Sequence, residues 1–195
     1  MDAWLWIIAV LAAALGAVEA VFVALAIRLV VPIFERRPPF NVRPADPDPA
    51  AEPIRFAGAD DLELAGSIHR PTGPPQGLIV FCPEFGGSHW SAPAYVGALI
   101  DAGFAVFAFD FRNQGESDSE SGYSPSHWLT DREVADALSA LRYANSLPEF
   151  AGLPIGMFGV SRGANAALVA AARSTQVRAV AVEGAFSTDA MMLFY

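Results

Sequence analysis

The sequence contains no lysine, one cysteine and only three histidines among its 195 residues. The absence of lysine excludes any mechanism that uses a lysine base or a Schiff base. The single Cys82 permits no internal disulfide, so the cysteine count is compatible with any redox compartment. All 12 basic residues are arginines, and 21 acidic residues give a formal net charge of −9. This charge disfavours general binding to a nucleic-acid backbone.

Charged residues are also scarce, at 17% of the sequence, whereas 53% of the residues are hydrophobic and the mean hydropathy is +0.35. These values argue against disorder, a collagen-like repeat and a coiled coil, which need a more polar or more periodic composition. At roughly 100–200 residues per domain, the length allows one domain plus an appendage.

The appendage lies at the N-terminus, where an apolar segment runs from Trp4 to Ile27 and is interrupted only by Glu19. As a helix this segment would span about 36 Å, enough to cross a hydrocarbon core of about 30 Å. We therefore predict a transmembrane signal anchor over residues 3–34. The alternatives are a cleaved signal peptide, with Ala24-Leu25-Ala26 as its cleavage site, and a buried amphipathic helix.

The charges that flank this segment indicate its orientation. Only Asp2 precedes the apolar run, and four arginines follow it on the C-terminal side: Arg28, Arg36, Arg37 and Arg43. Positive charge is enriched on the cytoplasmic side of membrane helices. The main domain is therefore predicted to be cytoplasmic.

Residues 35–53 are predicted to be a linker, because six of the 15 prolines fall between Pro38 and Pro53. Such a run resists helix and sheet formation and behaves as a semi-stiff, extended spacer. Residues 54–195 then form the soluble domain, at a short distance from the membrane.

In this domain short apolar runs alternate with helical patterns. The runs Ile54–Phe56 and Leu62–Ile68 flank a turn and predict a hairpin, and the continuous apolar run Leu78–Cys82 predicts a fully buried strand. Further strands are predicted at Phe104–Phe109, Ile155–Phe158 and Val177–Val182, and helices at Ala94–Ala102, Thr130–Asn145 and Ala164–Ala172. The fold class is therefore α/β, with a mostly parallel sheet covered by helices on both faces.

Between a predicted strand and a predicted helix, Gly159, Ser161 and Gly163 form a Gly-x-Ser-x-Gly pattern. The bare pattern is short enough to occur by chance, and an ordinary glycine-rich turn is the alternative interpretation. In this context it predicts a sharp turn with a strained, exposed serine, where larger residues at the glycine positions would collide with strand and helix. The N-terminus of the following helix would favour the negative charge of a tetrahedral intermediate at Ser161.

Two further loops follow predicted strands at the same edge of the sheet. In the loop Pro83–Ser88, the backbone N–H of Phe85 is predicted to form an oxyanion hole with that of Arg162, and a plain tight turn is the alternative. The second loop carries Asp110 and Arg112. We expect these two residues to pair with each other structurally and to shape the loop rather than to carry out chemistry.

These landmarks resemble the α/β-hydrolase family, specifically its lysophospholipase-like and serine-aminopeptidase-like branch. The resemblance covers roughly Ile54 to Thr188 and implies that Ser161 is the acyl nucleophile, with Phe85 and Arg162 supplying the oxyanion amides. Members usually carry a His-Gly pair in the first loop, where this chain has Pro83-Glu84. The resemblance depends on the order and spacing of Phe85-Gly86-Gly87, Asp110-x-Arg112-x-x-Gly115-x-Ser117 and Gly159-x-Ser161-x-Gly163.

A hydrolase of this type needs a histidine base after the serine in the chain, and no histidine follows Ser161. We expect His69, at the end of the hairpin, to be a surface residue. His127 is expected to be a packing or surface residue. His89 lies just beyond the first loop, and we do not expect it to be catalytic either.

The only acidic residues after the serine are Glu183 and Asp189, and we expect Glu183 to be structural. The six predicted strands compare with eight in the family, whose last two carry the acid and the histidine. Without them Val177–Val182 would be an open, apolar sheet edge. We therefore expect the chain to be a fragment of a longer hydrolase.

The sequence thus predicts a membrane-anchored serine hydrolase that cleaves an ester or similar acyl bond through a Ser161 acyl-enzyme. Its predicted substrate is a small-molecule or lipid ester, and no cofactor or metal is implied. Because the histidine is missing, a catalytically inactive binding or scaffolding domain is the alternative. A third hypothesis is an assembly in which another subunit supplies the histidine across the open sheet edge.

Overall fold

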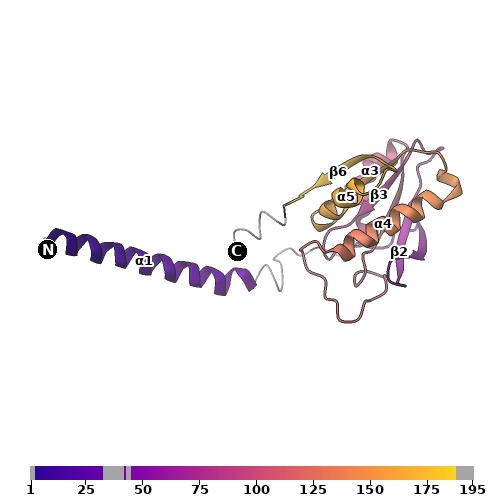
Figure 1. Cartoon of the computed structure of the whole chain (residues 1–195). Helices are drawn as coiled ribbons and strands as arrows, with labels where there is room; N and C mark the ends of the chain where they lie inside the picture. Colours follow the sequence, from indigo (N-terminus) through magenta and orange to yellow (C-terminus); the bar gives the residue numbers. More distant parts are fainter. Residues whose placement is uncertain (1–2, 33–41, 43–44, 188–195) are drawn as a thin grey trace. The chain divides into compact units, whose positions relative to one another are not determined.

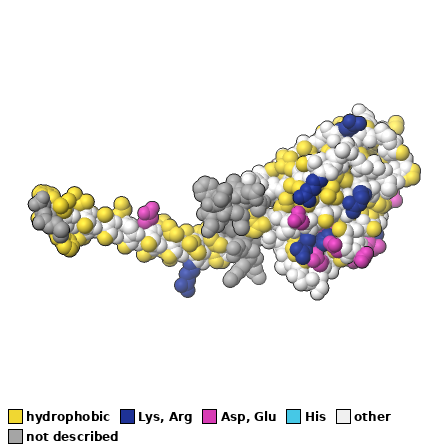
Figure 2. Space-filling model, in the orientation of Figure 1, with side chains coloured by type: hydrophobic (Ala, Val, Ile, Leu, Met, Phe, Trp, Pro, Cys, Tyr) yellow, Lys and Arg dark blue, Asp and Glu magenta, His cyan; other side chains and the backbone are white. Residues whose placement is uncertain are grey.

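The computed structural model describes residues 3–32, 42 and 45–187, and the chain divides into two compact units, residues 1–41 and 42–195. The first unit contains helix α1 (Ala3–Leu29), and none of its side chains is buried. Its hydropathy of 2.5 and its 27 residues make it long and apolar enough to cross a membrane. Figure 2 shows hydrophobic side chains along the whole helix. Such a helix near the N-terminus is typical of a membrane span or a signal sequence.

The second unit is built on a sheet whose six described strands lie in the order β1-β2-β4-β3-β5-β6 (Figure 1). β2 pairs antiparallel with both β1 and β4, and the remaining pairs are parallel. The predicted hairpin and the mostly parallel sheet are therefore confirmed. The strands are β1 (Glu52–Ala57), β2 (Glu63–His69), β3 (Leu78–Cys82), β4 (Ala105–Phe109), β5 (Ile155–Val160) and β6 (Val177–Glu183).

Helices cover both faces of this sheet, as predicted (Figure 1). Alanines of α4 and α5 pack in one core cluster with sheet residues such as Phe107 and Met157. On the opposite face, Val96 of α3 packs with Phe81 and Val106. The helical segments are η1 (His89–Ser91), α3 (Ala92–Asp101), α4 (Asp131–Ser146), η2 (Pro148–Phe150) and α5 (Arg162–Ala172).

The start of α4 is set by the capping box that the sequence predicts. The hydroxyl of Thr130 accepts a hydrogen bond from the amide of Arg132 at 3.2 Å, and Glu133 Oε2 accepts one from the amide of Thr130 at 2.9 Å. These bonds satisfy N–H groups that have no partner within the helix.

The domain begins earlier than the sequence indicates. Glu52 and Pro53, which we assigned to the linker, belong to β1, an edge strand where a proline does not break the hydrogen-bond ladder. Further upstream, Asp48 Oδ2 lies 3.3 Å from His69 Nδ1. The end of the proline-rich segment is therefore part of the folded domain and not of the spacer.

At the other end of the sheet, β6 pairs with β5 alone among the described strands. Its apolar side chains remain accessible, with Val180 39% and Val182 38% exposed. In the part of the chain that the structure describes, β6 is thus the open apolar edge that the sequence predicts.

Candidate active site

Ser161 lies in a sharp turn between β5 and α5 with φ 53° and ψ −119°, a backbone conformation that non-glycine residues rarely adopt. A Cβ atom on Gly159 would lie 2.4 Å from the carbonyl oxygen of Gly163. A Cβ on Gly163 would lie 2.2 Å from the carbonyl oxygen of Cys82. Both glycines are therefore required sterically, and the strained serine turn predicted from the motif is present.

Hydrogen bonds on both sides of the turn hold it in this conformation. The amide of Ser161 donates to the carbonyl oxygen of Glu183 at 2.8 Å, which links the turn to the end of β6. The carbonyl oxygen of Ser161 accepts a bond from the amide of Ala164 at 3.0 Å. Ser161 itself is only half-buried, so it lies near the surface, at the carboxyl end of β5.

The loop after β3 contacts this turn directly, because the Gly163 Cβ position is also 2.3 Å from the carbonyl oxygen of Pro83. Within the loop, the amide of Gly87 donates to the carbonyl oxygen of Glu84 at 3.0 Å, and the amide of Gly86 donates to Gln114 Oε1 at 3.1 Å. The loop is thus fixed by its own turn and by the neighbouring loop.

The two amides predicted to form the oxyanion hole are not used elsewhere in the described fold. No described residue accepts a hydrogen bond from the amide of Phe85 or of Arg162. The guanidinium of Arg162 lies over the ring of Phe85, with 5.0 Å from its carbon to the ring centroid. The side chains of the two residues are therefore neighbours.

The side chain of Arg162 is fully buried and links the turn to the segment before α4. Its Nη1 donates to the carbonyl oxygen of Ser126 at 2.8 Å and lies 3.3 Å from Glu133 Oε1. Glu133 also accepts a hydrogen bond from the Tyr123 hydroxyl. A buried guanidinium costs stability unless it is paired, so these contacts fix the position of Arg162.

Asp110 shapes the second loop from a fully buried position. Its carboxylate accepts hydrogen bonds from the amides of His89 at 2.6 Å and Glu116 at 2.8 Å. Burial raises the pKa of Asp110 to about 6. The carboxylate thereby joins the end of the first loop to the second loop.

Arg112 is buried as well, and it does not bond to Asp110. Its guanidinium nitrogens lie 2.7 Å from Asp136, 2.8 Å from Asp60 and 2.8 Å from Glu120. Both residues therefore have a structural role, as expected, but the expectation that they pair with each other is wrong, because each has partners of its own.

The expectation that His69 is a surface residue is wrong, because only 4% of it is exposed. Its Nε2 lies 3.0 Å from the Ser67 hydroxyl and its Nδ1 lies 3.3 Å from Asp48 Oδ2, which is the order of groups in a serine–histidine–aspartate relay. Ser67 is completely buried and therefore inaccessible to a substrate. Burial lowers the pKa of His69. The contact between His69 and Asp48 joins the segment that precedes β1 to β2.

The other two histidines differ in their surroundings. His89 is buried, with Nε2 3.8 Å from Asp110 Oδ2, and burial lowers its pKa to about 4. No hydrogen bond or ion pair joins His69 or His89 to Ser161 in the described part of the chain. His127 is half-buried and its ring packs against Trp128 with 4.3 Å between centroids, which confirms its packing role.

The remaining candidate groups do not complete a catalytic triad. Glu183 contributes its carbonyl oxygen to the turn and its side chain is exposed, whereas Asp189 lies outside the described residues. Cys82 is buried, and burial raises the pKa of its thiol, so it is not a reactive nucleophile. Among the described residues, no group of three or more His, Cys, Asp or Glu side chains is arranged to hold a metal ion.

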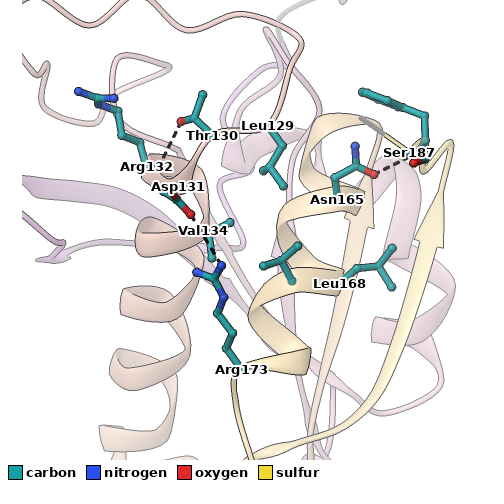
Figure 3. Close-up of a pocket in the computed structure, with 11 residues that line it drawn as sticks. Leu129, Thr130, Asp131, Arg132, Val134, Asn165, Leu168, Arg173 and Ser187 are labelled. Atoms are coloured by element: carbon teal, nitrogen blue, oxygen red, sulfur yellow. Dashed lines mark hydrogen bonds and ion pairs between the residues drawn. The ribbon is translucent and has the colours of Figure 1, made fainter. Parts of the chain in front are cut away.

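A cavity of about 710 Å³ lies between the start of α4 and helix α5 (Figure 3). Leu129, Val134 and Leu168 supply apolar walls, and Ser161 is not among the lining residues. Asn165 Oδ1 accepts a hydrogen bond from the amide of Phe186 at 3.1 Å. Asn165, Leu168 and Val169 of α5 thus line this cavity, and Ser161 does not.

Comparison with known proteins gives an independent result. The family model described as serine aminopeptidase, S33, matches residues 73–193. A putative phosphoribosyl transferase of Mycobacterium tuberculosis is 34% identical over 143 residues, which are 72% of this chain and 31% of that protein. An uncharacterized 31.7 kDa protein of Escherichia coli is 31% identical over 123 residues, which are 63% of this chain and 40% of that protein. The chain thus spans about a third of the length of these curated relatives.

Among solved structures, an esterase of Pyrococcus furiosus superposes with a TM-score of 0.59 and 21% identity. The superposition covers 73% of this chain and 53% of the esterase. At this identity the likeness concerns the fold, and it confirms the α/β-hydrolase arrangement of the sheet.

The backbone contact at Gly163 leads to a direct test. Replacing Gly163 with alanine is expected to lower the free energy of unfolding by about 1–3 kcal/mol, because the Cβ would overlap two carbonyl oxygens that belong to the backbone. Gly97→Ala in helix α3 is the matched control, because a Cβ there meets nothing within 4 Å. It should be neutral or stabilise by up to about 1 kcal/mol. Urea unfolding of both variants measures the difference, and equal stabilities would contradict the steric argument.

Proposed function

Because this chain belongs to the serine aminopeptidase S33 family of α/β hydrolases, we propose that it is a serine hydrolase with Ser161 as its nucleophile. The observation that carries the proposal is the strained turn at Ser161, held in backbone contact with the loop after β3. Ser161 is half-buried at the carboxyl end of β5, and the amides of Phe85 and Arg162 have no acceptor among the described residues.

In the proposed reaction the Ser161 hydroxyl oxygen attacks the carbonyl carbon of an ester and transfers its proton to a general base. The carbonyl oxygen becomes an oxyanion and accepts hydrogen bonds from the amides of Phe85 and Arg162. Collapse of this intermediate breaks the bond to the alcohol, which leaves with a proton from the base, and water then hydrolyses the acyl-enzyme. Neither His69 nor His89 is placed to act as this base.

The substrate class that we propose is a small-molecule or lipid ester. The family's name concerns aminopeptidases, and the structural neighbour from Pyrococcus furiosus is called an esterase. Both activities cleave an acyl bond through the same kind of intermediate. Cleavage of an ester depends less on protonation of the leaving group by a general acid than cleavage of an amide does, because an alcohol leaves more readily than an amine.

A second candidate is a binding or scaffolding domain that has the sheet but no activity. One observation favours it: the sequence contains no histidine after Ser161, where the family places the base. The two candidates differ in the reactivity of Ser161 toward a mechanism-based probe.

A fluorophosphonate reagent provides this probe, because it forms a covalent bond only with an activated serine. We expect the protein to be labelled and Ser161→Ala to abolish labelling, since the reacting oxygen is removed. Ser67→Ala is the matched control, because Ser67 is hydrogen-bonded to a histidine but is completely buried. Labelling is read by in-gel fluorescence and by mass spectrometry of the modified peptide. Absence of labelling at Ser161 in the wild-type protein would contradict the hydrolase proposal and support the binding or scaffolding domain.

We further propose that α1 anchors the domain to a membrane, with the four following arginines placing the domain on the cytoplasmic side. An apolar helix that is exposed on all sides needs an apolar surrounding, and a bilayer supplies it. Membrane attachment suits a lipid ester as substrate.

The anchor is tested by cell fractionation. We expect the full chain to remain in the membrane pellet after carbonate extraction and a version that lacks residues 1–41 to be soluble. Cleavage of the domain by protease added to inside-out vesicles, and protection in right-side-out vesicles, is the expected topology result. Recovery of the full chain in the soluble fraction, or the reverse protection pattern, would contradict the proposal.

A further inference from the structure

Glu84 is an unusual residue in the loop that precedes the proposed oxyanion amide. Only 5% of it is exposed, although it lies at the sheet edge where substrates are expected. Its carboxyl packs against Gly87, where a Cβ atom would be 2.6 Å from Glu84 Cδ. The Tyr95 hydroxyl donates a hydrogen bond to Glu84 Oε1 at 3.2 Å. The other oxygen, Oε2, is buried without a hydrogen-bond partner among the described residues.

The surroundings of this carboxyl make it harder to ionise than a carboxyl in water. Burial raises the pKa of Glu84, and the nearby carboxylate of Glu183 raises it further. Hydrogen bonds from Tyr95 and from the backbone amide of Glu84 lower the pKa, but they do not offset the burial. Tyr95, which faces Glu84 from α3, has its own pKa raised to about 12 by burial and by Glu84, so it stays protonated. In the part of the chain that the structure describes, no basic side chain forms an ion pair with Glu84, and the phenol of Tyr95 that faces it is neutral.

The position of Glu84 makes its charge important for the proposed chemistry. Phe85, the next residue, supplies one of the amides that would bind the oxyanion. A negative charge this close would repel the charge that develops on the substrate oxygen in the transition state. A neutral carboxyl, by contrast, holds the turn from Glu84 to Gly87 without this repulsion.

We propose that Glu84 is a positioning residue of the oxyanion site, whose buried carboxyl packs between Tyr95 and Gly87 and fixes the turn that presents the amide of Phe85. The inference rests on the proposed function, because it concerns the loop that would stabilise the acyl-transfer intermediate. It also explains why Gly87 lacks a side chain: the Glu84 carboxyl occupies the place of its Cβ.

The test compares rates of fluorophosphonate labelling at Ser161 in the full chain between pH 5.5 and pH 9. Glu84→Gln retains the size of the side chain and the acceptor for Tyr95 but cannot ionise, so at pH 5.5 it should label no more than about twofold more slowly than wild type. The ratio of the Glu84→Gln rate to the wild-type rate should not fall as the pH rises, because only the wild type can carry a negative charge beside the oxyanion site. Taking this ratio removes the pH dependence of the general base, which both proteins share.

Glu84→Ala tests positioning separately from charge. Loss of the packed carboxyl should slow labelling about tenfold or more at every pH, because one misplaced oxyanion donor is costly. Circular dichroism and thermal unfolding establish that the variant is folded. A Glu84→Ala rate equal to wild type, or a Glu84→Gln rate tenfold below it at pH 5.5, would overturn the proposal.

A second measurement separates this inference from the proposed function. Amide hydrogen exchange in peptides spanning residues 83–88 should be faster in Glu84→Ala than in wild type and unchanged in Glu84→Gln. Absence of labelling in the wild-type protein would contradict the hydrolase proposal alone, and the exchange rates would still decide whether Glu84 positions the loop. Identical exchange in all three proteins overturns the positioning role.

Discussion

The close approach of Gly163 to the carbonyl oxygens of Cys82 and Pro83 is the constraint on which the site depends. β3 and β5 are parallel neighbours, with Cys82 opposite Gly159, so their carboxyl ends meet at one edge of the sheet. The chain leaves β3 as a loop and leaves β5 as a turn into α5. The loop and the turn can approach this closely only because Gly163 has no side chain at their contact. Ser161 adopts its strained conformation within the same turn.

Buried charged groups then hold the surrounding loops in place. Arg162 links the turn to the segment before α4 through Ser126 and Glu133, and Arg112 links three separate carboxylates. Burial of ions is unfavourable unless every charge is paired, so such networks contribute little net stability but penalise other loop arrangements. These contacts hold the loops near Ser161 in one arrangement. α4 and α5 pack on one face of the sheet and α3 packs on the other.

The local motifs were predictable from the sequence because their causes are local. The Gly-x-Ser-x-Gly pattern encodes the turn at Ser161, and Thr130 with Glu133 encodes the start of α4. The burial of His69 was not predictable, because its face of β2 is covered by tertiary packing and its partner Asp48 lies in a segment whose prolines indicate a spacer. The same holds for Arg112, whose partners Asp60 and Asp136 are distant along the chain.

Glu84 shows the same limit at the site itself. Its place in the loop is evident from the sequence, where it departs from the pair that the family usually has. Its burial against Gly87 and its bond to Tyr95 depend on how α3 packs on the sheet. The sequence alone assigns this carboxyl no role, whereas its surroundings in the structure indicate support of the loop.

The most direct test of this account is a crystal structure of the protein after reaction with a fluorophosphonate. The account predicts a covalent bond between Ser161 Oγ and phosphorus, with the phosphoryl oxygen about 2.7–3.1 Å from the amide nitrogens of both Phe85 and Arg162. An adduct on another residue, or a phosphoryl oxygen that points away from these two amides, would contradict it.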